Sequence, residues 1–185
     1  MKRRRYLIDD SAYTVFVTTT IIQWLPVFTD QALAGEALKI FEQEKDRHAL
    51  RVFAYVLMPS HLHAVIKSAH KGDLSVFMRR WKSKTARFIL DYCQQLYPDW
   101  HKKFAENALA HGLLGSQKYQ VWMPRFDDYA IRTEEEMVIK INYIHGNPLK
   151  HDLVDDVEEY PYSSYADYNE GQNGYVTIDC GQGKP

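Results

Sequence analysis

The sequence predicts an α+β sandwich in which helices cover one mainly antiparallel sheet. Short stretches rich in β-branched and aromatic residues alternate with longer segments whose apolar residues recur at helical spacing. With 185 residues and 45% apolar composition, the chain is long enough to bury a core of its own. No internal repeat or linker interrupts it. We therefore expect one domain over residues 1–185 in which helices pack on a sheet.

Three strands and one helix are predicted in the first part of the chain. Tyr13–Thr20, with the sequence YTVFVTTT, has the composition of a strand. A helix capped by Asp30 and extending to about Leu50 follows, because its apolar residues recur at helical spacing among charged residues. The period then becomes that of a strand in Val52–Met58 and again in His61–Lys67. The Pro-Ser pair between them predicts a bend or bulge, so the second strand either pairs with the first or continues it.

A second helix is predicted from about Asp73 to Leu96, with an aromatic stripe beside a basic flank. Residues 98–118 have a mixed pattern that assigns them to neither a helix nor a strand. Within them a loop is marked by three small residues: Gly112, Gly115 and Ser116. A short strand is expected at Tyr119–Trp122, before Pro124.

The last predicted helix begins at a capping box formed by Thr133 and Glu136. We expect it to run to about Gly146 and to stop at Pro148, because proline cannot continue a helix hydrogen-bond pattern. Residues 151–185 are aromatic, polar and acidic, which favours an irregular C-terminal wrap over a helix.

Composition points to a cytoplasmic, unprocessed protein. The two cysteines, Cys93 and Cys180, are far apart and form no pattern typical of a disulfide framework or a thiolate zinc site. No apolar run approaches the roughly 20 residues that span a bilayer, and no apolar segment follows the basic start MKRRRYLIDD. We therefore expect no membrane partner.

The net charge is -1, but the charged residues are distributed unevenly, with an acidic segment and a basic cluster. No Lys or Arg occurs between Lys150 and Lys184, where eight acidic residues lie. The basic cluster lies on the second helix and would suit a polyanion such as nucleic acid, although a basic helix is often only a solvated face. The cluster consists of Arg79, Arg80, Lys82, Lys84 and Arg87.

His61 and His63 are the first candidate site. On a strand, residues two apart point to the same face, while Leu62 points to the other. Two neutral imidazoles held in this way are good ligands for a divalent ion. With eight histidines in the chain, a chance pair is the alternative.

Tyr143 and Asn147 are the second candidate site. They are four residues apart on the last helix and so share a face. Their alternative roles are a packed ring and a helix end before Pro148. Combined with the His pair, they predict a metal site that polarises a phosphodiester while the phenol attacks it.

Several motifs together resemble the REP-associated tyrosine transposases, single-tyrosine members of the His-hydrophobic-His (HUH) superfamily. They are AYVLMPSHLHAVI, FMRRWKSKTARF, IRTEEE, YIHGNPLKHDLV and YPYSSY, in this order. The resemblance implies a ferredoxin-like sheet flanked by helices and cleavage of single-stranded DNA near hairpins, with Mg²⁺ or Mn²⁺. It implies that His61, His63 and Asn147 are metal ligands and that Tyr143 becomes linked to a 5′ phosphate, leaving a 3′ hydroxyl. The related group includes monomers and domain-exchanged dimers, and we expect a monomer here.

The chain departs from the family pattern at two places. Ser60 replaces the usual Asn before the first His, and His151-Asp152 stands where a small residue and Gly often follow the Lys. Neither change touches the expected chemistry, but both bear on the turn after the tyrosine helix, and Asp152 would weaken DNA affinity if it faced the substrate.

The nuclease interpretation requires Tyr143 to approach the His pair and the basic helix to border the same cleft. The basic residues would then hold phosphates, and Trp81 or nearby aromatics would stack on unpaired bases. Two alternatives remain at this level. One is a non-catalytic nucleic-acid binding module, and the other is a metal hydrolase that activates water while Tyr143 only orients the substrate.

Overall fold

The computed structural model describes residues 13–112, 118–169 and 174–179. At its centre lies a four-stranded antiparallel sheet with the strand order β2-β3-β1-β4. The strands are β1 (Tyr13–Thr20), β2 (Arg51–Met58), β3 (His61–Ser68) and β4 (Asp127–Ala130). This strand order and the helices between the strands confirm the predicted α+β, ferredoxin-like sheet flanked by helices.

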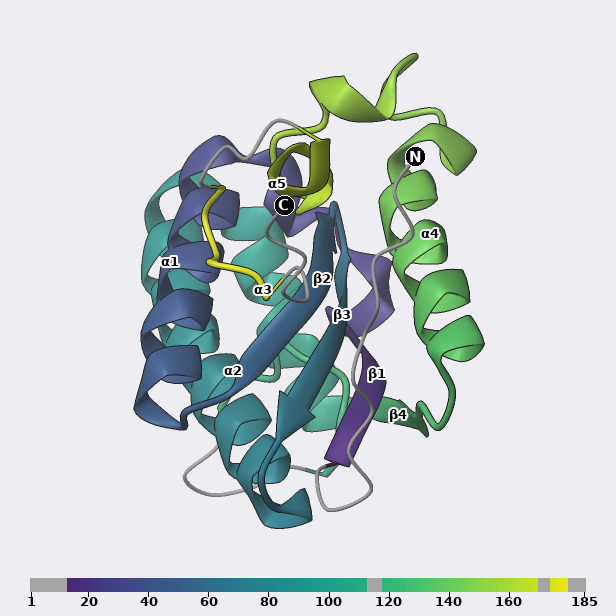
Figure 1. Cartoon of the computed structure of the whole chain (residues 1–185). Helices are drawn as coiled ribbons and strands as arrows, with labels where there is room; N and C mark the ends of the chain where they lie inside the picture. Colours follow the sequence, from purple (N-terminus) through teal and green to yellow (C-terminus); the bar gives the residue numbers. More distant parts are fainter. Residues whose placement is uncertain (1–12, 113–117, 170–173, 180–185) are drawn as a thin grey trace.

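Helices cover both faces of the sheet, as Figure 1 shows. On one face lie α1 (Gln31–Arg47), α2 (Lys71–Leu96) and α3 (Pro98–Ala110), whose apolar side chains share a core with the sheet. On the other face lies α4 (Glu134–Lys150), which forms a separate, smaller core. The molecule therefore has three layers.

Side chains of β3 point alternately to the two faces of the sheet, so they contribute in turn to the two cores. Leu62 and Ala64 belong to the core under α1 and α2, whereas Val65 belongs to the core under α4. His61 and His63 share the face of Val65, because all three have the same parity on the strand. Every residue of β3 is buried, since both faces of the sheet are covered.

Most predicted elements occur at the expected places. β1 has the predicted bounds, and Asp30 caps α1 by accepting hydrogen bonds from the backbone N–H groups of Ala32 and Leu33. Of the two arrangements open for His61–Lys67, the structure shows pairing, with β2 and β3 forming an antiparallel hairpin across Pro59 and Ser60. Cys93 is a buried free thiol.

Between residues 98 and 130 one expectation was wrong, the strand at Tyr119–Trp122, and two elements were not predicted, helix α3 and strand β4. The mixed segment after residue 98 begins with helix α3, which has Pro98 in its first turn, a position that needs no N–H donor. Tyr119–Trp122 forms no strand; it runs beside the end of β1 through single hydrogen bonds and one isolated bridge. The fourth strand is instead Asp127–Ala130, an exposed edge whose polar sequence has no strand pattern. Gly115 and Ser116 lie outside the described residues.

Pro148 does not stop α4. The helix continues to Lys150, and the backbone N–H of His151 still bonds to the carbonyl of Asn147. Pro148 is buried, and its packing outweighs the lost donor of the last turn. Thr133 caps the helix as predicted, but Glu136 accepts from the N–H of Arg132 and not from that of Thr133.

The C-terminal segment contains more structure than predicted. A 3-10 turn at Val157–Glu159 and a short helix α5 (Tyr165–Asn169) interrupt the irregular path. Residues 170–173 and 180–185, with Glu170 and Cys180, lie outside the described residues. Within the described residues, no helix combines the length and apolar character that a membrane crossing requires.

Candidate active site

The His pair lies on the α4 face of β3, as its spacing predicts. The ring centroids of His61 and His63 are 4.7 Å apart, and both residues are buried. The Nδ1 atom of His61 lies 3.1 Å from Ser60 Oγ, and that of His63 lies 2.7 Å from Thr18 Oγ1. A ring whose Nδ1–H is bonded to a hydroxyl presents the lone pair of Nε2 to a metal. Ser60, one of the departures from the family pattern, thus orients a predicted ligand.

Both rings are neutral at physiological pH. Burial lowers the pKa of His61 to about 4, and the charge of His151 adds to this effect. Burial also lowers the pKa of His63 to about 3, with further contributions from His61, His151 and Lys140. A neutral imidazole is the form that binds a metal ion, so the pair needs no deprotonation before binding.

The side chain of Asn147 fits the role of a third ligand. It is 1% exposed, and its Nδ2 donates a 2.6 Å hydrogen bond to the backbone carbonyl of Tyr143. Its Oδ1 is buried and has no hydrogen-bond partner among the described residues. Such an atom loses the free energy of its hydration unless something binds it. Within the described ranges no third His, Cys, Asp or Glu forms a metal cluster with the His pair, which leaves this amide oxygen as the candidate for the third donor. Two neutral imidazoles and one amide oxygen fit a divalent cation.

Tyr143 extends the row of rings. Its ring centroid lies 5.4 Å from that of His63 and 5.8 Å from that of Phe16, and the residue is 41% exposed. The four-residue spacing on α4 places Tyr143 and Asn147 on one helix face, as predicted. The first requirement of the nuclease interpretation, that the phenol approaches the His pair, is met.

Two lysines beside Tyr143 are further candidates for the site that the sequence reasoning missed. Lys140 Nζ lies 6.0 Å from the centroid of the Tyr143 ring and 4.6 Å from that of Phe16, and Lys150 Nζ lies 5.9 Å from the Tyr143 centroid. Neither lysine has an ion-pair partner among the described residues. Helix spacing of three and seven residues from Tyr143 was the signal that could have found them.

The second requirement, that the basic helix borders the same cleft, is not met. The sheet separates α2 from the His pair (Figure 1). Arg80 and Lys84 form ion pairs of 2.7 Å with the buried carboxylate of Glu44 on α1. Trp81 is fully buried and donates to the carbonyl of Ala37, so it cannot stack on a base.

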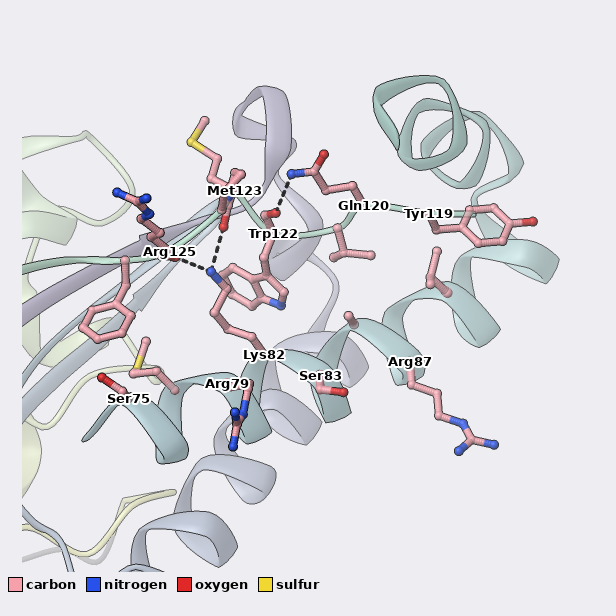
Figure 2. Close-up of a pocket in the computed structure, with 16 residues that line it drawn as sticks. Ser75, Arg79, Lys82, Ser83, Arg87, Tyr119, Gln120, Trp122, Met123 and Arg125 are labelled. Carbon is pink, nitrogen blue, oxygen red and sulfur yellow. Dashed lines mark hydrogen bonds between the residues drawn. The ribbon is translucent and has the colours of Figure 1, made fainter. Parts of the chain in front are cut away.

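Three of the five basic residues line a groove of about 820 Å³ between α2 and residues 119–126. Figure 2 shows Lys82 reaching to the backbone carbonyls of Met123 and Arg125, to which it donates hydrogen bonds, while Arg79 and Arg87 extend outward. Burial lowers the pKa of Lys82 to about 8. Lys82 therefore anchors a loop, and the two exposed arginines remain available for a ligand.

Comparison with known proteins identifies the family. The model of the IS200-like transposase family matches residues 12–122. A REP-associated tyrosine transposase of Escherichia coli is 29% identical over 140 residues, 76% of this chain and 67% of the relative. A Haemophilus influenzae protein assigned to the same group is 23% identical over 132 residues, 71% of the chain and 68% of the relative.

A solved structure of the same group shares the fold. The structure of a REP-associated tyrosine transposase bound to a REP hairpin superimposes with a TM-score of 0.60 at 23% identity, covering 98% of this chain and 94% of the other. The resemblance read from the sequence motifs is thereby confirmed. The chain belongs to the IS200-like transposase family and is a DNA-processing enzyme of the tyrosine transposase kind.

Proposed function

We propose that this protein cuts and rejoins single-stranded DNA through a covalent 5′-phosphotyrosine at Tyr143. The observation that carries the proposal is the successive ring contact of Tyr143, His63 and His61, with Asn147 one helix turn from Tyr143 and its Oδ1 without a partner among the described residues. A water-activating hydrolase has no need of an exposed phenol at this place. The family membership supports the same chemistry.

His61, His63 and Asn147 would hold a divalent ion, Mg²⁺ or Mn²⁺. When bound there, such an ion supplies Lewis-acid polarisation of the phosphodiester. The phenol oxygen of Tyr143 attacks phosphorus, its proton passes to solvent, and the bond from phosphorus to the 3′ oxygen breaks. The leaving oxygen takes up a proton and becomes a 3′ hydroxyl, and the reverse reaction rejoins the strand.

Lys140 and Lys150 supply positive charge where the phosphate must lie. Their ammonium groups flank the Tyr143 ring, and a phosphate under attack gains negative charge that such groups stabilise. Lys140 is held by the faces of Phe16 and Tyr129, which attract a cation without neutralising it.

Hairpin DNA formed by repeated palindromes is the proposed substrate. A protein of the same fold is bound to a REP hairpin in its solved structure. In this chain, Arg79 and Arg87 at the α2 groove are placed to hold backbone phosphates of a paired stem, while the unpaired segment enters the Tyr143 site on the other side of the sheet.

The test is incubation of the protein and its Tyr143→Phe variant with labelled single-stranded hairpin DNA and Mg²⁺ or Mn²⁺, followed by a denaturing gel. We expect a metal-dependent, covalently shifted band with the wild type and none with the variant. Cleavage without an adduct that survives in Tyr143→Phe would show that water is the nucleophile. Binding without cleavage across several hairpins would show a binding module.

A further inference from the structure

Trp24 is an exposed aromatic side chain that the proposed chemistry does not use. It is 58% exposed, the largest fraction of any aromatic residue among those described, although it lies at the active site. Its ring centroid lies 5.3 Å from that of His61, in an edge contact at 75°. An indole in water beside a candidate metal ligand leaves most of its surface uncovered, which is unfavourable unless a ligand covers it.

The backbone that presents Trp24 is strained. Gln23 and Trp24 have φ values of 52° and 55°, in the left-handed region that residues with bulky side chains rarely adopt. The turn is held by hydrogen bonds from Trp24 N–H to the Ile21 carbonyl and from Leu25 N–H to the Ile22 carbonyl. Strained positions of this kind cluster at sites that bind ligands.

The position of Trp24 relative to Tyr143 indicates which part of the DNA substrate Trp24 would contact. Rings contact one another in the order Tyr143, His63, His61, Trp24, so the indole and the nucleophile lie at opposite ends of the row. In an in-line displacement the leaving oxygen points away from the attacking oxygen. The nucleotide that leaves with the 3′ hydroxyl is therefore on the Trp24 side of the phosphate.

A hollow next to Trp24 can receive the strand that leaves. It has a volume of about 410 Å³ and is lined in part by Thr18, which bonds to His63, by Gln23, which precedes Trp24, and by Arg125. Arg125 is exposed and also lines the α2 groove, so the two depressions meet at this residue.

We propose that Trp24 is the stacking platform for the unpaired base immediately 5′ of the cleaved phosphate. The indole face is offered to the base, and stacking of this kind accepts any base because each has a π face. The platform holds the leaving nucleotide near the phosphotyrosine, which keeps its 3′ hydroxyl available for rejoining. This inference rests on the proposed function, since it needs a cleaved phosphate beside Tyr143.

A purely structural role for Trp24, holding the His61 ring in place, predicts different behaviour. In that case replacement of Trp24 would reduce metal affinity and leave no dependence on a particular base. Both quantities are measurable in the Tyr143→Phe background, which under the proposed function should bind DNA without cutting it.

The experiment is a double-mutant cycle that combines replacement of Trp24 in the protein with removal of single bases from the DNA. Binding to Tyr143→Phe, with and without Trp24→Leu, is measured for the hairpin oligonucleotide and for a series carrying one abasic site at each position around the cleavage point. Tyr175→Leu, an exposed aromatic of the C-terminal segment, is the control, and Mn²⁺ affinity and thermal midpoint are measured for each protein. Tryptophan fluorescence is recorded on DNA addition with Trp24 present and with Trp24→Phe.

The expected loss on Trp24→Leu is about 5- to 100-fold in affinity for the intact oligonucleotide, the range of one stacked base. The abasic site immediately 5′ of the cleavage point should cost a similar factor with Trp24 and nothing further with Trp24→Leu. DNA should quench a fluorescence component that Trp24→Phe lacks. Of the other three tryptophans, Trp81 and Trp122 are buried, and Trp100 is partly buried and stacks on Tyr97. The Tyr175→Leu control should bind like its parent.

The platform would be overturned if the affinity losses from Trp24→Leu and from an abasic site multiplied at every position, because no base would then depend on Trp24. It would also be overturned if a loss of Mn²⁺ affinity accounted for the whole effect of Trp24→Leu. Either result would leave the proposed function intact. Absence of a Tyr143-dependent adduct with any hairpin would overturn the proposed function and the platform with it. An abasic coupling on the 3′ side of the cleavage point would also contradict the assignment, because it would reverse the direction of attack.

Discussion

At the scale of single residues, the candidate active site contains groups whose hydrogen-bonding or ion-pairing capacity the described residues leave unused. Asn147 Oδ1 is buried without a partner, the two imidazoles are held neutral, and the ammonium groups of Lys140 and Lys150 face aromatic rings instead of carboxylates. A buried oxygen without a hydrogen bond is unfavourable in the free protein, whereas neutral imidazoles and ammonium groups without a carboxylate partner are ready to bind a cation and a phosphate. Two of these groups give direct predictions.

Replacing Asn147 by Leu should weaken Mn²⁺ binding by about 10-fold or more, because one oxygen donor is lost while the His pair remains. Asn147→Asp should bind at least as tightly as the wild type, since it keeps the donor and adds a charge. Isothermal titration calorimetry measures both. Equal affinity in wild type and Asn147→Leu would remove Asn147 from the ligand set.

Replacing Lys140 by Met should slow formation of the Tyr143 adduct about 100-fold, the effect of removing one group that stabilises charge in the transition state. Lys140→Arg should retain much of the rate, and Lys39→Met, an exposed lysine on α1, should retain all of it. Single-turnover cleavage at saturating DNA is the measurement. A rate for Lys140→Met within a factor of two of wild type would show that this ammonium does not act on the phosphate.

At the scale of elements, the basic helix α2 divides its charges between two tasks. Three of its cations connect α2 to other parts of the fold. Arg80 and Lys84 form ion pairs with Glu44 of α1, and Lys82 donates hydrogen bonds to the carbonyls of residues 123 and 125. Burial alone would raise the pKa of Glu44, but its hydrogen bonds and charge interactions with Lys84 and Arg80 lower it to about 2. Arg79 and Arg87 are exposed in the α2 groove, and they are the two residues proposed to contact DNA.

Arg79→Ala and Arg87→Ala should each weaken hairpin binding by the Tyr143→Phe protein, with little dependence on base sequence. Each should reduce the slope of the logarithm of affinity against the logarithm of salt concentration by about 1, because one phosphate contact is lost. Arg47→Ala, on α1, is the control, and fluorescence anisotropy across a salt series is the measurement. An unchanged slope in both variants would remove the α2 groove from the DNA path.

At the scale of the whole molecule, the candidate site lies between strand β3 and helix α4 of a sheet that helices cover on both faces. His61 and His63 are buried because α4 covers their face, and Glu44 is buried because α2 covers α1. Burial of these titratable groups makes the stability of the folded protein depend on pH in two separate windows.

The unfolding free energy of the metal-free protein should fall as pH drops from about 6.5 toward 4. In this range both histidines take up protons in the unfolded chain. They stay neutral in the folded protein, where the pKa values of His61 and His63 are about 4 and 3. A second loss should follow between about 4.5 and 2, where the stabilisation by ionised Glu44 disappears.

Urea unfolding over a pH series measures both windows, and the loss in the first should be on the order of a few kcal/mol. The His61→Asn, His63→Asn double variant should flatten the upper window alone, and Glu44→Gln should flatten the lower one alone. An upper window that persists in the double variant would show that other groups carry it.

The sequence by itself determined the strands β1 to β3, the capped starts of α1 and α4, and the His pair and tyrosine motifs. These depend on local patterns: alternation on a strand, spacing on a helix, and a side chain that caps its own helix. It did not predict β4, since an exposed edge strand such as Asp127–Ala130 forms by pairing with β1 and needs no apolar pattern.

Only the tertiary structure decided which of the chemically able residues belong to the site. Five basic residues on α2 looked alike in sequence, but layer packing buries or pairs three of them and places all five across the sheet from Tyr143. The sequence favoured Trp81 as a residue that stacks on bases, but the structure buries it in the core. Nothing in the sequence indicated Trp24, which the turn after β1 places beside His61. Contacts between segments far apart in the chain are set by which faces bury together, and a local pattern carries no information about its partner.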